Sequence, residues 1–373
     1  MTEAGISQRA PRVARPEEVT VAQAEVERSI RDWDAPGIEA VSPGVHRVPL
    51  PLPGDALKAV NVYVIEDGDG LVLIDSGQYL SDARIGLERA LATLGAGIGD
   101  VRDFLVTHVH RDHYTQAIAL RREFGTRVSL GAGESVSIAA VQDPANAPIS
   151  RQHKLLELCG AAPLIELLRH LAPNEGDALR GLFETPDAWL EDRVVVDLSS
   201  RALRVVSTPG HTRGHVVFYD EGAQLLFAGD HVLPHITPSI AFEPVPSENA
   251  LGRYLASLSL VRNLPDARLL PAHGPVVPSV HARVDELVVH HEHRLDATFE
   301  AVAEGRHTPY EAAQGLRWTR RERPFETLDP MNQMLAVMET KVHLDLLAAQ
   351  GRILQGISDG VLVFETLPVA GAS

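Results

Sequence analysis

Apolar residues along the chain alternate between short runs typical of strands and longer stretches with helical spacing. The segments "GVHRVPLPL", "VNVYVIED" and "GLVLIDSG" predict three strands, and "EDGDG" predicts a hairpin turn between the last two. "SDARIGLERALATLG" has helical spacing and ends in glycine. "VRDFLV" predicts a buried strand and "YTQAIALRREFG" a second helix. Strands that alternate with helices in this way predict an α/β body.

Residues 132–190 have a different pattern. "ESVSIAAVQ", "HKLLELCGAAPLIELLRHL" and "EGDALRGLF" predict helices, after which "RVVVDL", "ALRVVSTPG", "HVVFYD" and "AQLLFAGD" predict strands again. We interpret the helical block as a cap inserted into a β-rich body. Its leucine-rich stretch either lines an apolar pocket of the site or packs on the body, and the sequence leaves both open.

The C-terminal part, from about residue 283, changes pattern once more. Three helical segments are followed by "RILQGISDGVLVFE", a hairpin with "SDG" at its turn. This order predicts a winged-helix-like domain over residues 283–366. The body then spans residues 41–282, and residues 1–40 form an N-terminal extension with a short helix. We expect the tail "PVAGAS" to be disordered.

Composition narrows the function classes. The formal net charge of −16 disfavours binding to phosphate backbones and to anionic membranes. No run approaches 18 apolar residues, and the N-terminal stretch has no apolar core of a signal peptide. The single cysteine, Cys159, excludes an intramolecular disulfide, and its apolar surroundings predict a buried filler. We expect a cytoplasmic protein with a small-molecule substrate, and a homo-oligomer remains open.

"THVHRDH", residues 107–113, places His108, His110, Asp112 and His113 directly after the strand "VRDFLV". Imidazole and carboxylate groups are ligands for zinc, iron and related metals. His108 and His110 are two apart on an extended segment, so they point the same way. Asp112 and His113 follow the turn and can point to a second position. One loop can therefore serve two adjacent metal ions.

Three further apolar strands each end in a side chain that can bind a metal. "STPGHTRGH" supplies His211, "LLFAGDH" supplies Asp230, and "LLPAHG" supplies His273. A lone histidine at a strand end is ordinarily a structural or surface residue. Together with the first loop, however, these strand ends predict one site built from residues distant in sequence.

These motifs resemble the metallo-β-lactamase-fold hydrolase superfamily over about residues 44–280, in the order H-x-H-x-D-H, G-H-T, G-D and A-H-G. The resemblance implies an αββα sandwich with two zinc ions at one edge, with iron or manganese as the alternative metals. His108, His110 and His211 would hold one ion, Asp112, His113 and His273 the other, and Asp230 would bridge them. Asp75 in "LIDSG" would steady a ligand histidine, although a helix N-cap or a turn residue is an equally good interpretation of this residue.

The implied reaction is hydrolysis by a metal-bound hydroxide, since zinc lowers the pKa of its water to about 7. Asp112 would orient this nucleophile while binding the metal. We expect an ester, thioester or lactone carbonyl on a small, partly apolar substrate. His215, His231, His235 and Tyr114 are further candidates for contacts around the site, although structural roles explain them equally well.

Several alternatives remain. The C-terminal segment resembles that of the beta-lactamase-like protein 2 group, some of whose members are endoribonucleases. "RWTRRERP" holds four arginines, but residues 283–352 contain 9 Arg and Lys against 12 Asp and Glu, a net charge of −3. A 2-His-1-carboxylate iron site from His108, His211 and Asp230 would resemble persulfide dioxygenases, and a non-catalytic scaffold is the third alternative. "HHEH" (290–293) indicates a helix face or an interdomain contact rather than another metal site.

Overall fold

Two β-sheets form the centre of the molecule in this computed structural model, which describes residues 32–143, 148–169, 179–240 and 242–368. The first sheet has seven strands in sequence order, β1 Glu39–Ser42, β2 Val45–Pro51, β3 Ala59–Asp67, β4 Gly70–Ile74, β5 Val101–Val106, β6 Arg127–Gly131 and β7 Ala188–Leu190. The second has five, in the order β12 Arg268–Pro271, β11 Leu225–Gly229, β10 Val216–Asp220, β9 Ala202–Ser207 and β8 Val195–Asp197.

The sheets pack face to face because their facing side chains are apolar. Tyr63, Ile74 and Leu105 of the first sheet share one buried cluster with Phe218 and Phe227 of the second. Strands buried on both faces read as continuous apolar runs, and β3 has this pattern with seven successive buried positions. The hairpin expected at "EDGDG" joins β3 to β4.

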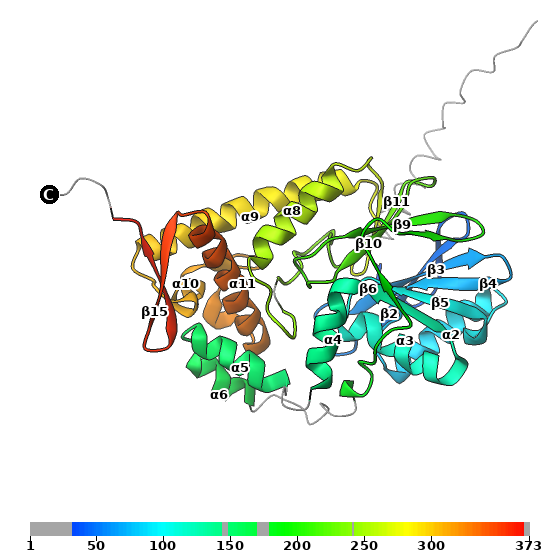
Figure 1. Cartoon of the computed structure of the whole chain (residues 1–373), viewed down its shortest axis with the longest axis horizontal. Helices are drawn as coiled ribbons and strands as arrows, with labels where there is room; N and C mark the ends of the chain where they lie inside the picture. The colour runs from blue at the N-terminus through cyan, green and yellow to red at the C-terminus, as the bar shows by residue number, and fades with distance from the viewer. Residues whose placement is uncertain (1–31, 144–147, 170–178, 241, 369–373) are drawn as a thin grey trace, which may run out of the picture.

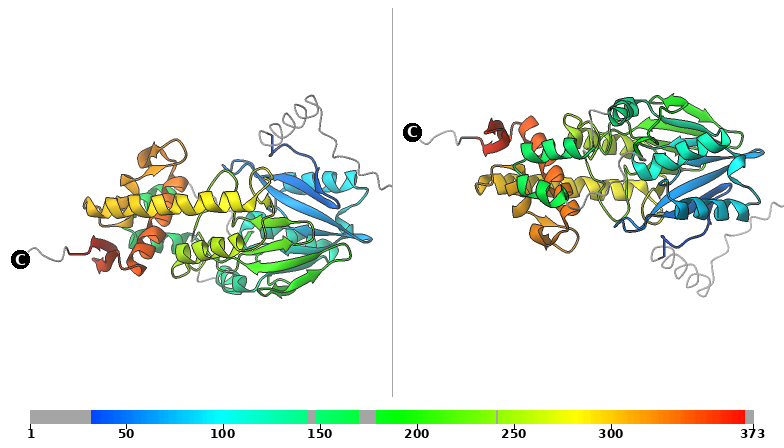
Figure 2. Two further views of the ribbon diagram at one scale, coloured as in Figure 1. Left: turned by 90° about the horizontal axis from the view of Figure 1, so that it is seen from above. Right: turned by 90° about the horizontal axis from the view of Figure 1, so that it is seen from below.

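Helices cover the two outer faces, which gives four layers (Figures 1 and 2). Helices α2 Ser81–Thr93 and α3 Arg111–Phe124 contribute apolar side chains to the core on the outer side of the first sheet. Helix α8 Ala250–Arg262 and the first half of α9 Val280–Ala303 share a core with β9, β10 and β11 of the second sheet. The predicted αββα sandwich is confirmed.

The helical insertion does not act as one cap on the body. Helix α4 Ser135–Gln142 packs on the sandwich through Ile138. Helices α5 Pro148–Leu158 and α6 Ala162–Arg169 instead share an apolar cluster with the C-terminal helices, in which Cys159 is buried. Gly160, with φ of +75°, ends α5 and separates the two helices. The predicted segment "EGDALRGLF" and the N-terminal helix begin outside the described residues, and the tail "PVAGAS" lies outside them after Pro368.

The C-terminal part contains α9, α10 Pro309–Gly315, the short pair β13 Arg317–Trp318 and β14 Arg323–Pro324, α11 Pro330–Ala349, and the hairpin of β15 Ile353–Ser358 with β16 Val361–Thr366. Asp329 caps α11 as expected, since its side chain accepts a hydrogen bond from the Asn332 N–H at 3.1 Å. The expected order of helices and hairpin is therefore present. The designation as a winged helix and the domain boundaries stay predictions, and the boundary at 283 falls inside α9.

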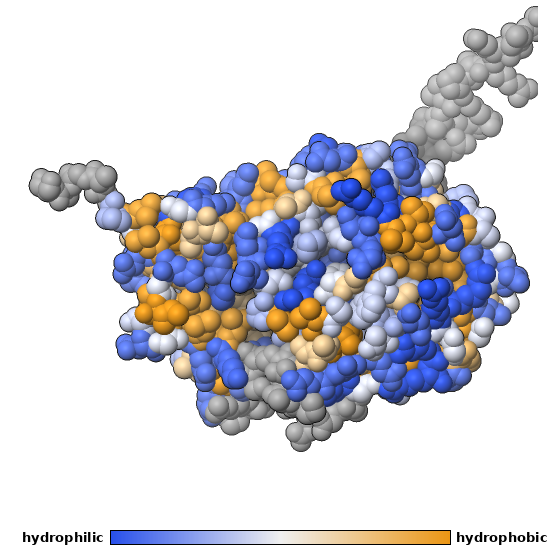
Figure 3. All heavy atoms as spheres, viewed as in Figure 1, coloured by the Kyte–Doolittle hydropathy of each residue, from blue (hydrophilic) through white to orange (hydrophobic). Residues whose placement is uncertain are grey.

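The end of the molecule that carries the terminal hairpin shows apolar patches among polar ones in Figure 3. Strand β15 leaves Ile357 68% and Leu354 48% exposed. Patches of this kind often mark contacts with a partner, and a homo-oligomer stays a prediction. Across the described parts of the chain, every helix is too short or too polar to cross a membrane.

Candidate metal centre

The loop between β5 and α3 carries four of the predicted site residues. Strand β5 ends at Val106, and the extended residues that follow place His108 and His110 on the same side. Asp112 and His113 lie in the first turn of α3. The two pairs fall into two different groups of potential metal ligands, and their assignment to two metal ions stays a prediction.

The other three predicted residues follow strands of the second sheet. His211 lies in the turn after β9, Asp230 directly follows β11, and His273 lies two residues after β12. Strands β9 and β11 are each antiparallel to β10, and β12 is parallel to β11, so all three strands point the same way. Their carboxyl ends therefore meet at one edge of the sandwich. The loop after β5 lies at the same edge and faces them.

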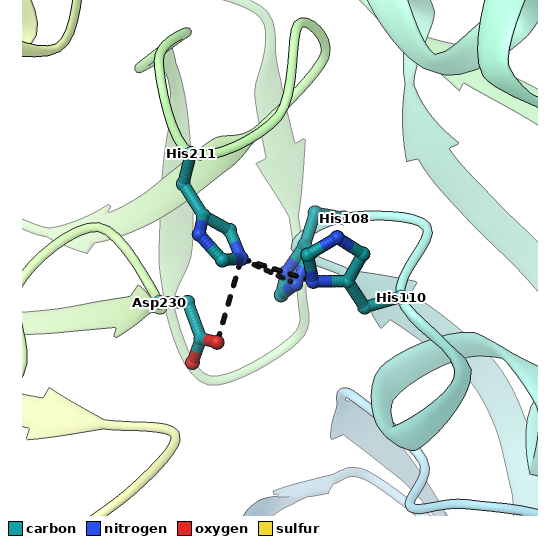
Figure 4. A group of neighbouring side chains, drawn as sticks. All are labelled: His108, His110, His211 and Asp230. Carbon is teal, nitrogen blue, oxygen red and sulfur yellow. Dashed lines mark hydrogen bonds and ion pairs between the residues drawn. The ribbon is translucent and has the colours of Figure 1, made fainter. Parts of the chain in front are cut away.

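The first group contains His108, His110, His211 and Asp230, whose ligand atoms all lie within 4.8 Å of one another (Figure 4). His211 Nε2 is 3.2 Å from His108 Nε2 and 3.0 Å from His110 Nδ1. Asp230 Oδ2 is 3.5 Å from the same His211 nitrogen.

The second group contains Asp112, His113 and His273. Asp112 Oδ2 lies 3.4 Å from His273 Nε2 and 3.6 Å from His113 Nε2. Asp230 also reaches this group through its other oxygen, Oδ1, which is 3.4 Å from His273 Nε2 and 3.8 Å from His113 Nε2. Asp230 thus has one oxygen directed at each group.

Each histidine is held from behind by a group that accepts a hydrogen bond. His211 Nδ1 donates to the Ser239 carbonyl at 2.6 Å, His273 Nδ1 to the Ala59 carbonyl at 2.7 Å, His110 Nε2 to the Phe242 carbonyl at 2.9 Å, His113 Nδ1 to Asp75 at 2.9 Å, and His108 Nδ1 to the Thr107 hydroxyl at 3.0 Å. A neutral imidazole that donates from one nitrogen keeps a lone pair on the other. When these rings are neutral, all five inner nitrogens therefore present lone pairs to the centre.

Lone pairs that face one another need a cation between them. His110 Nδ1 and His211 Nε2 are 3.0 Å apart with no proton left to share. In the second group, His113 Nε2, His273 Nε2 and Asp230 Oδ1 are buried without a hydrogen-bond partner among the described residues. Buried polar atoms are nearly always paired. The nitrogen and oxygen donors here fit two cations of the zinc or iron type.

Asp75 supports the second group. Its carboxylate accepts hydrogen bonds from the Thr107 N–H at 2.8 Å and from His113. The alternative of a helix N-cap is wrong, because Leu80 occupies the N-cap of α2. Contacts of this kind fix the orientation and tautomer of a metal-binding histidine.

The electrostatics of the second group favour positive charge. Burial lowers the pKa of His113, but the carboxylates of Asp75, Asp112 and Asp230 outweigh it and raise this pKa to about 9. The pKa of His273 is raised well above its ordinary value for the same reason. Burial raises the pKa of Asp230, yet the neighbouring imidazoles hold it well below the usual range. The first group differs, since burial lowers the pKa of His211 to about 3.

Gly229 allows Asp230 to reach the centre. Its φ of +50° lies in the left-handed region, and a Cβ there would approach His215 Nε2 and Thr107 Oγ1 to 2.7 Å. The "GD" motif therefore needs both residues, one for space and one for its carboxylate.

The remaining sequence candidates have structural contacts. His215 stacks on His108 with ring centroids 5.0 Å apart, and its Nε2 accepts a hydrogen bond from the Asp230 N–H. The hydroxyl of Tyr114 donates to the Glu184 carbonyl. His231 is buried against the ring of Tyr254.

In "HHEH", His291 contacts a residue of the same predicted C-terminal domain, so its contact is not the interdomain one that was expected. Its Nδ1 lies 3.2 Å from Nε2 of His343 on α11. Sequence reasoning missed the carbonyls of Ser239 and Phe242, because a backbone acceptor leaves no mark in a sequence. It also missed Glu134, a buried carboxyl group that contacts Thr212 beside His211.

Known proteins resemble this chain in sequence. The lactamase-like protein nscB of Aspergillus fumigatus is 26% identical over 250 residues, 67% of this chain and 58% of that protein. The Beta-lactamase-like protein 2 homolog of Caenorhabditis elegans is 23% identical over 90% of this chain and 92% of its own length. An atrochrysone carboxyl ACP thioesterase of Cryptosporiopsis sp. is 26% identical over 66% of this chain and 59% of its own length.

A solved structure has the same fold over most of the chain. A metallo-beta-lactamase family protein from Thermus thermophilus is 27% identical, with a TM-score of 0.73, and the match covers 88% of this chain and all of that one. The model of the metallo-beta-lactamase superfamily matches residues 56–273, more than half of the chain. The chain therefore belongs to the metallo-beta-lactamase superfamily.

Proposed function

We propose that this protein is a hydrolase with two metal ions, zinc first among them, that cleaves an ester, thioester or lactone bond of a small, partly apolar substrate. The observation that carries the proposal is the set of buried lone pairs that converge on both oxygens of Asp230. In a structural cluster these atoms would form hydrogen bonds with one another. In a cation site their lone pairs would stay unpaired until the ion binds.

Each side chain has a distinct role in the proposal. His108, His110 and His211 would hold one ion, Asp112, His113 and His273 the other, and Asp230 would contact both. When bound, the two ions supply a water of lowered pKa and polarise the electrophilic carbonyl. The Asp112 carboxylate, which only accepts hydrogen bonds when ionised, would orient that water for attack.

Support for a partly apolar substrate comes from Phe242. Its carbonyl accepts the hydrogen bond from His110, and its side chain packs against the cluster of α5, α6, α10 and α11. One side of the centre is therefore apolar. The thioesterase among the relatives makes an acyl thioester the first choice within this class.

RNA cleavage is the alternative function. The turn between β13 and β14 holds Arg320 and Arg321 in exposed positions, which would suit a phosphate backbone. The net charge of −3 over residues 283–352 argues against this alternative.

Metal analysis and a substrate panel test the proposal together. We expect close to two zinc ions per chain, and hydrolysis of matched acyl thioesters, aryl esters and lactones with one acyl group. A single iron per chain would overturn the hydrolase assignment. Turnover of a short RNA without turnover of any acyl substrate would establish the ribonuclease alternative instead.

A further inference from the structure

A buried carboxyl group lies behind the first metal group. Glu134 ends the short 3-10 turn Ala132–Glu134 that follows β6, and its side chain is completely buried. Its Oε1 accepts a hydrogen bond from the hydroxyl of Thr212, the residue directly after His211. Glu134 is not among the side chains that converge on the metal centre.

Backbone contact holds Glu134 in this position. A Cβ on Gly133 would lie 2.8 Å from both the Arg213 carbonyl oxygen and the Gly214 Cα, and a Cβ on Gly214 would overlap the backbone of Glu134. The turn after β6 and the turn that carries His211 therefore touch without intervening side chains. This close approach fixes the position of the Glu134 backbone, and with it the starting point of its side chain, relative to the turn of His211.

The same carboxyl group also acts on the loop of the first two histidines. Burial raises the pKa of Glu134 to about 7, while the hydroxyls of Thr212 and Ser137 and the peptide N–H of Val109 lower it. Val109 is the residue between His108 and His110. Glu134 is therefore hydrogen-bonded to the turn that supplies His211 and lies close to the loop that supplies His108 and His110.

These loops need such a connection because their metal-binding atoms repel one another. His110 Nδ1 and His211 Nε2 face each other at 3.0 Å with lone pairs on both sides. Their mutual repulsion opposes this arrangement until a cation enters. A ligand set that stays in place without its ion needs support from outside the set.

We infer that Glu134 is a positioning residue for the first metal ion, whose carboxyl group holds the His211 turn in place beside the His108–His110 loop and so sets the affinity of this group for its ion. The inference rests on the proposed two-metal function. It assigns no such role at the second group, whose residues are supported instead by Asp75 and the Ala59 carbonyl.

Cobalt titration of the metal-free full-length protein tests this role, since the visible absorption of Co²⁺ reports the geometry around each ion. Glu134→Leu keeps a similar volume and removes the acceptor, and Thr212→Val removes the donor. We expect both to weaken one of two cobalt sites by about 10–100-fold and to change the absorption of that site, with the other site within about twofold of wild type.

Two further variants separate positioning from general damage. Glu134→Gln keeps a carbonyl oxygen for Thr212 and should restore the affinity to within a few-fold of wild type. Ile138→Val removes one buried methylene from α4 nearby and should leave both cobalt sites unchanged. Thr212→Val carries the test if Glu134→Leu does not fold.

The outcomes distinguish this inference from the function on which it rests. Wild-type protein that binds no cobalt overturns the two-metal function and the role of Glu134 with it. Wild-type protein with two sites, and variants Glu134→Leu and Thr212→Val that match it or lose both sites equally, overturns the role of Glu134 alone.

Discussion

The molecule buries histidines in two places, and the two places differ in chemistry. At the sandwich edge, five imidazoles converge and share the space with Asp112 and Asp230. Between helices α9 and α11, His291 and His343 form a buried pair with ring centroids 5.3 Å apart. The fold buries His291, His343 and four of the five imidazoles at the edge, and it leaves His110 half-buried.

The difference lies in the neighbouring carboxylates and in where each ring nitrogen points. Burial lowers the pKa of His343 to about 3, and no carboxylate among the described residues reverses the effect. His343 Nδ1 donates to the Glu339 carbonyl and its Nε2 contacts His291, so the ring has partners on both sides. At the sandwich edge the inner nitrogens instead face one another with lone pairs. Convergent lone pairs beside carboxylates therefore indicate a metal site better than burial does.

Removal of Asp230 should have the largest effect, because its two oxygens serve both groups. Asp230→Ala should lower both metal content and turnover by more than about 100-fold, since loss of a residue that only supports a ligand costs about 10–100-fold. Metal analysis and steady-state rates measure this. His343→Phe is the matched control, and an Asp230→Ala protein with wild-type activity would contradict the bridging assignment.

Metal removal should destabilise the protein because the cluster at the sandwich edge loses its ions. The His291–His343 pair should contribute nothing to this effect. Free metal at about 100 times its dissociation constant stabilises a protein by about 2.7 kcal/mol. A chelator should therefore lower the Tm by about 5 °C, measured by calorimetry. The His343→Phe variant should show the same shift and the Asp230→Ala variant very little. A full shift in Asp230→Ala would mean that the stabilising ion lies elsewhere.

Asp75→Asn should have a smaller effect that is confined to the second group. The side-chain amide supports His113 less well than the carboxylate that now accepts its Nδ1–H, so one ion should bind about 10–100-fold more weakly. Competition with a chromogenic chelator measures both affinities. Equal weakening of the two ions would show that Asp75 acts on the whole centre.

His343→Phe should have the smallest effect, and it should depend on pH. Loss of the hydrogen bond to the Glu339 carbonyl should cost about 1 kcal/mol at pH 8. The pKa of His343 is lowered to about 3 in the folded state against about 6.5 when unfolded. Below pH 6.5 the unfolded wild type therefore binds a proton that the folded protein does not, and wild-type stability falls.

Denaturant unfolding between pH 8 and pH 4 tests this pH dependence. The stability gap between wild type and His343→Phe should narrow as the pH falls below 6.5, and at about pH 4 the variant should be the more stable protein. A gap that is constant or widens would show that His343 is protonated in the folded protein.

Much of the centre could be predicted because its residues follow strands. The apolar runs before His108, His211, Asp230 and His273 identify strand ends, and an αββα fold brings such ends to one edge. The supporting carbonyls of Ser239 and Phe242 could not be predicted, because they depend on the path of an irregular loop. Glu134 was missed for a related reason, since "GAGES" resembles an ordinary turn.

The helical insertion was less predictable. Leucine spacing in "HKLLELCGAAPLIELLRHL" shows that helices form, but it does not show which surface they cover. Helices α5 and α6 pack on residues more than 140 positions later in the chain, such as Trp318 and Met334. Gly160 and Pro163 do indicate a break between the two helices. The long apolar stretch around them nevertheless predicts one continuous helix.

Helix α9 connects the sandwich to the C-terminal helices α10 and α11. Its 24 residues extend about 36 Å, from the outer face of the second sheet to the C-terminal helices (Figure 1). Val284 and Val302 near its two ends belong to one continuous apolar core that includes strands β11 and β16. A fragment that ends before residue 280 would lack α9 and would expose apolar side chains on the outer face of the second sheet. Such a fragment should therefore aggregate. The C-terminal quarter of the chain is therefore a structural part of the sandwich, and the sandwich and the C-terminal helices should unfold in one transition.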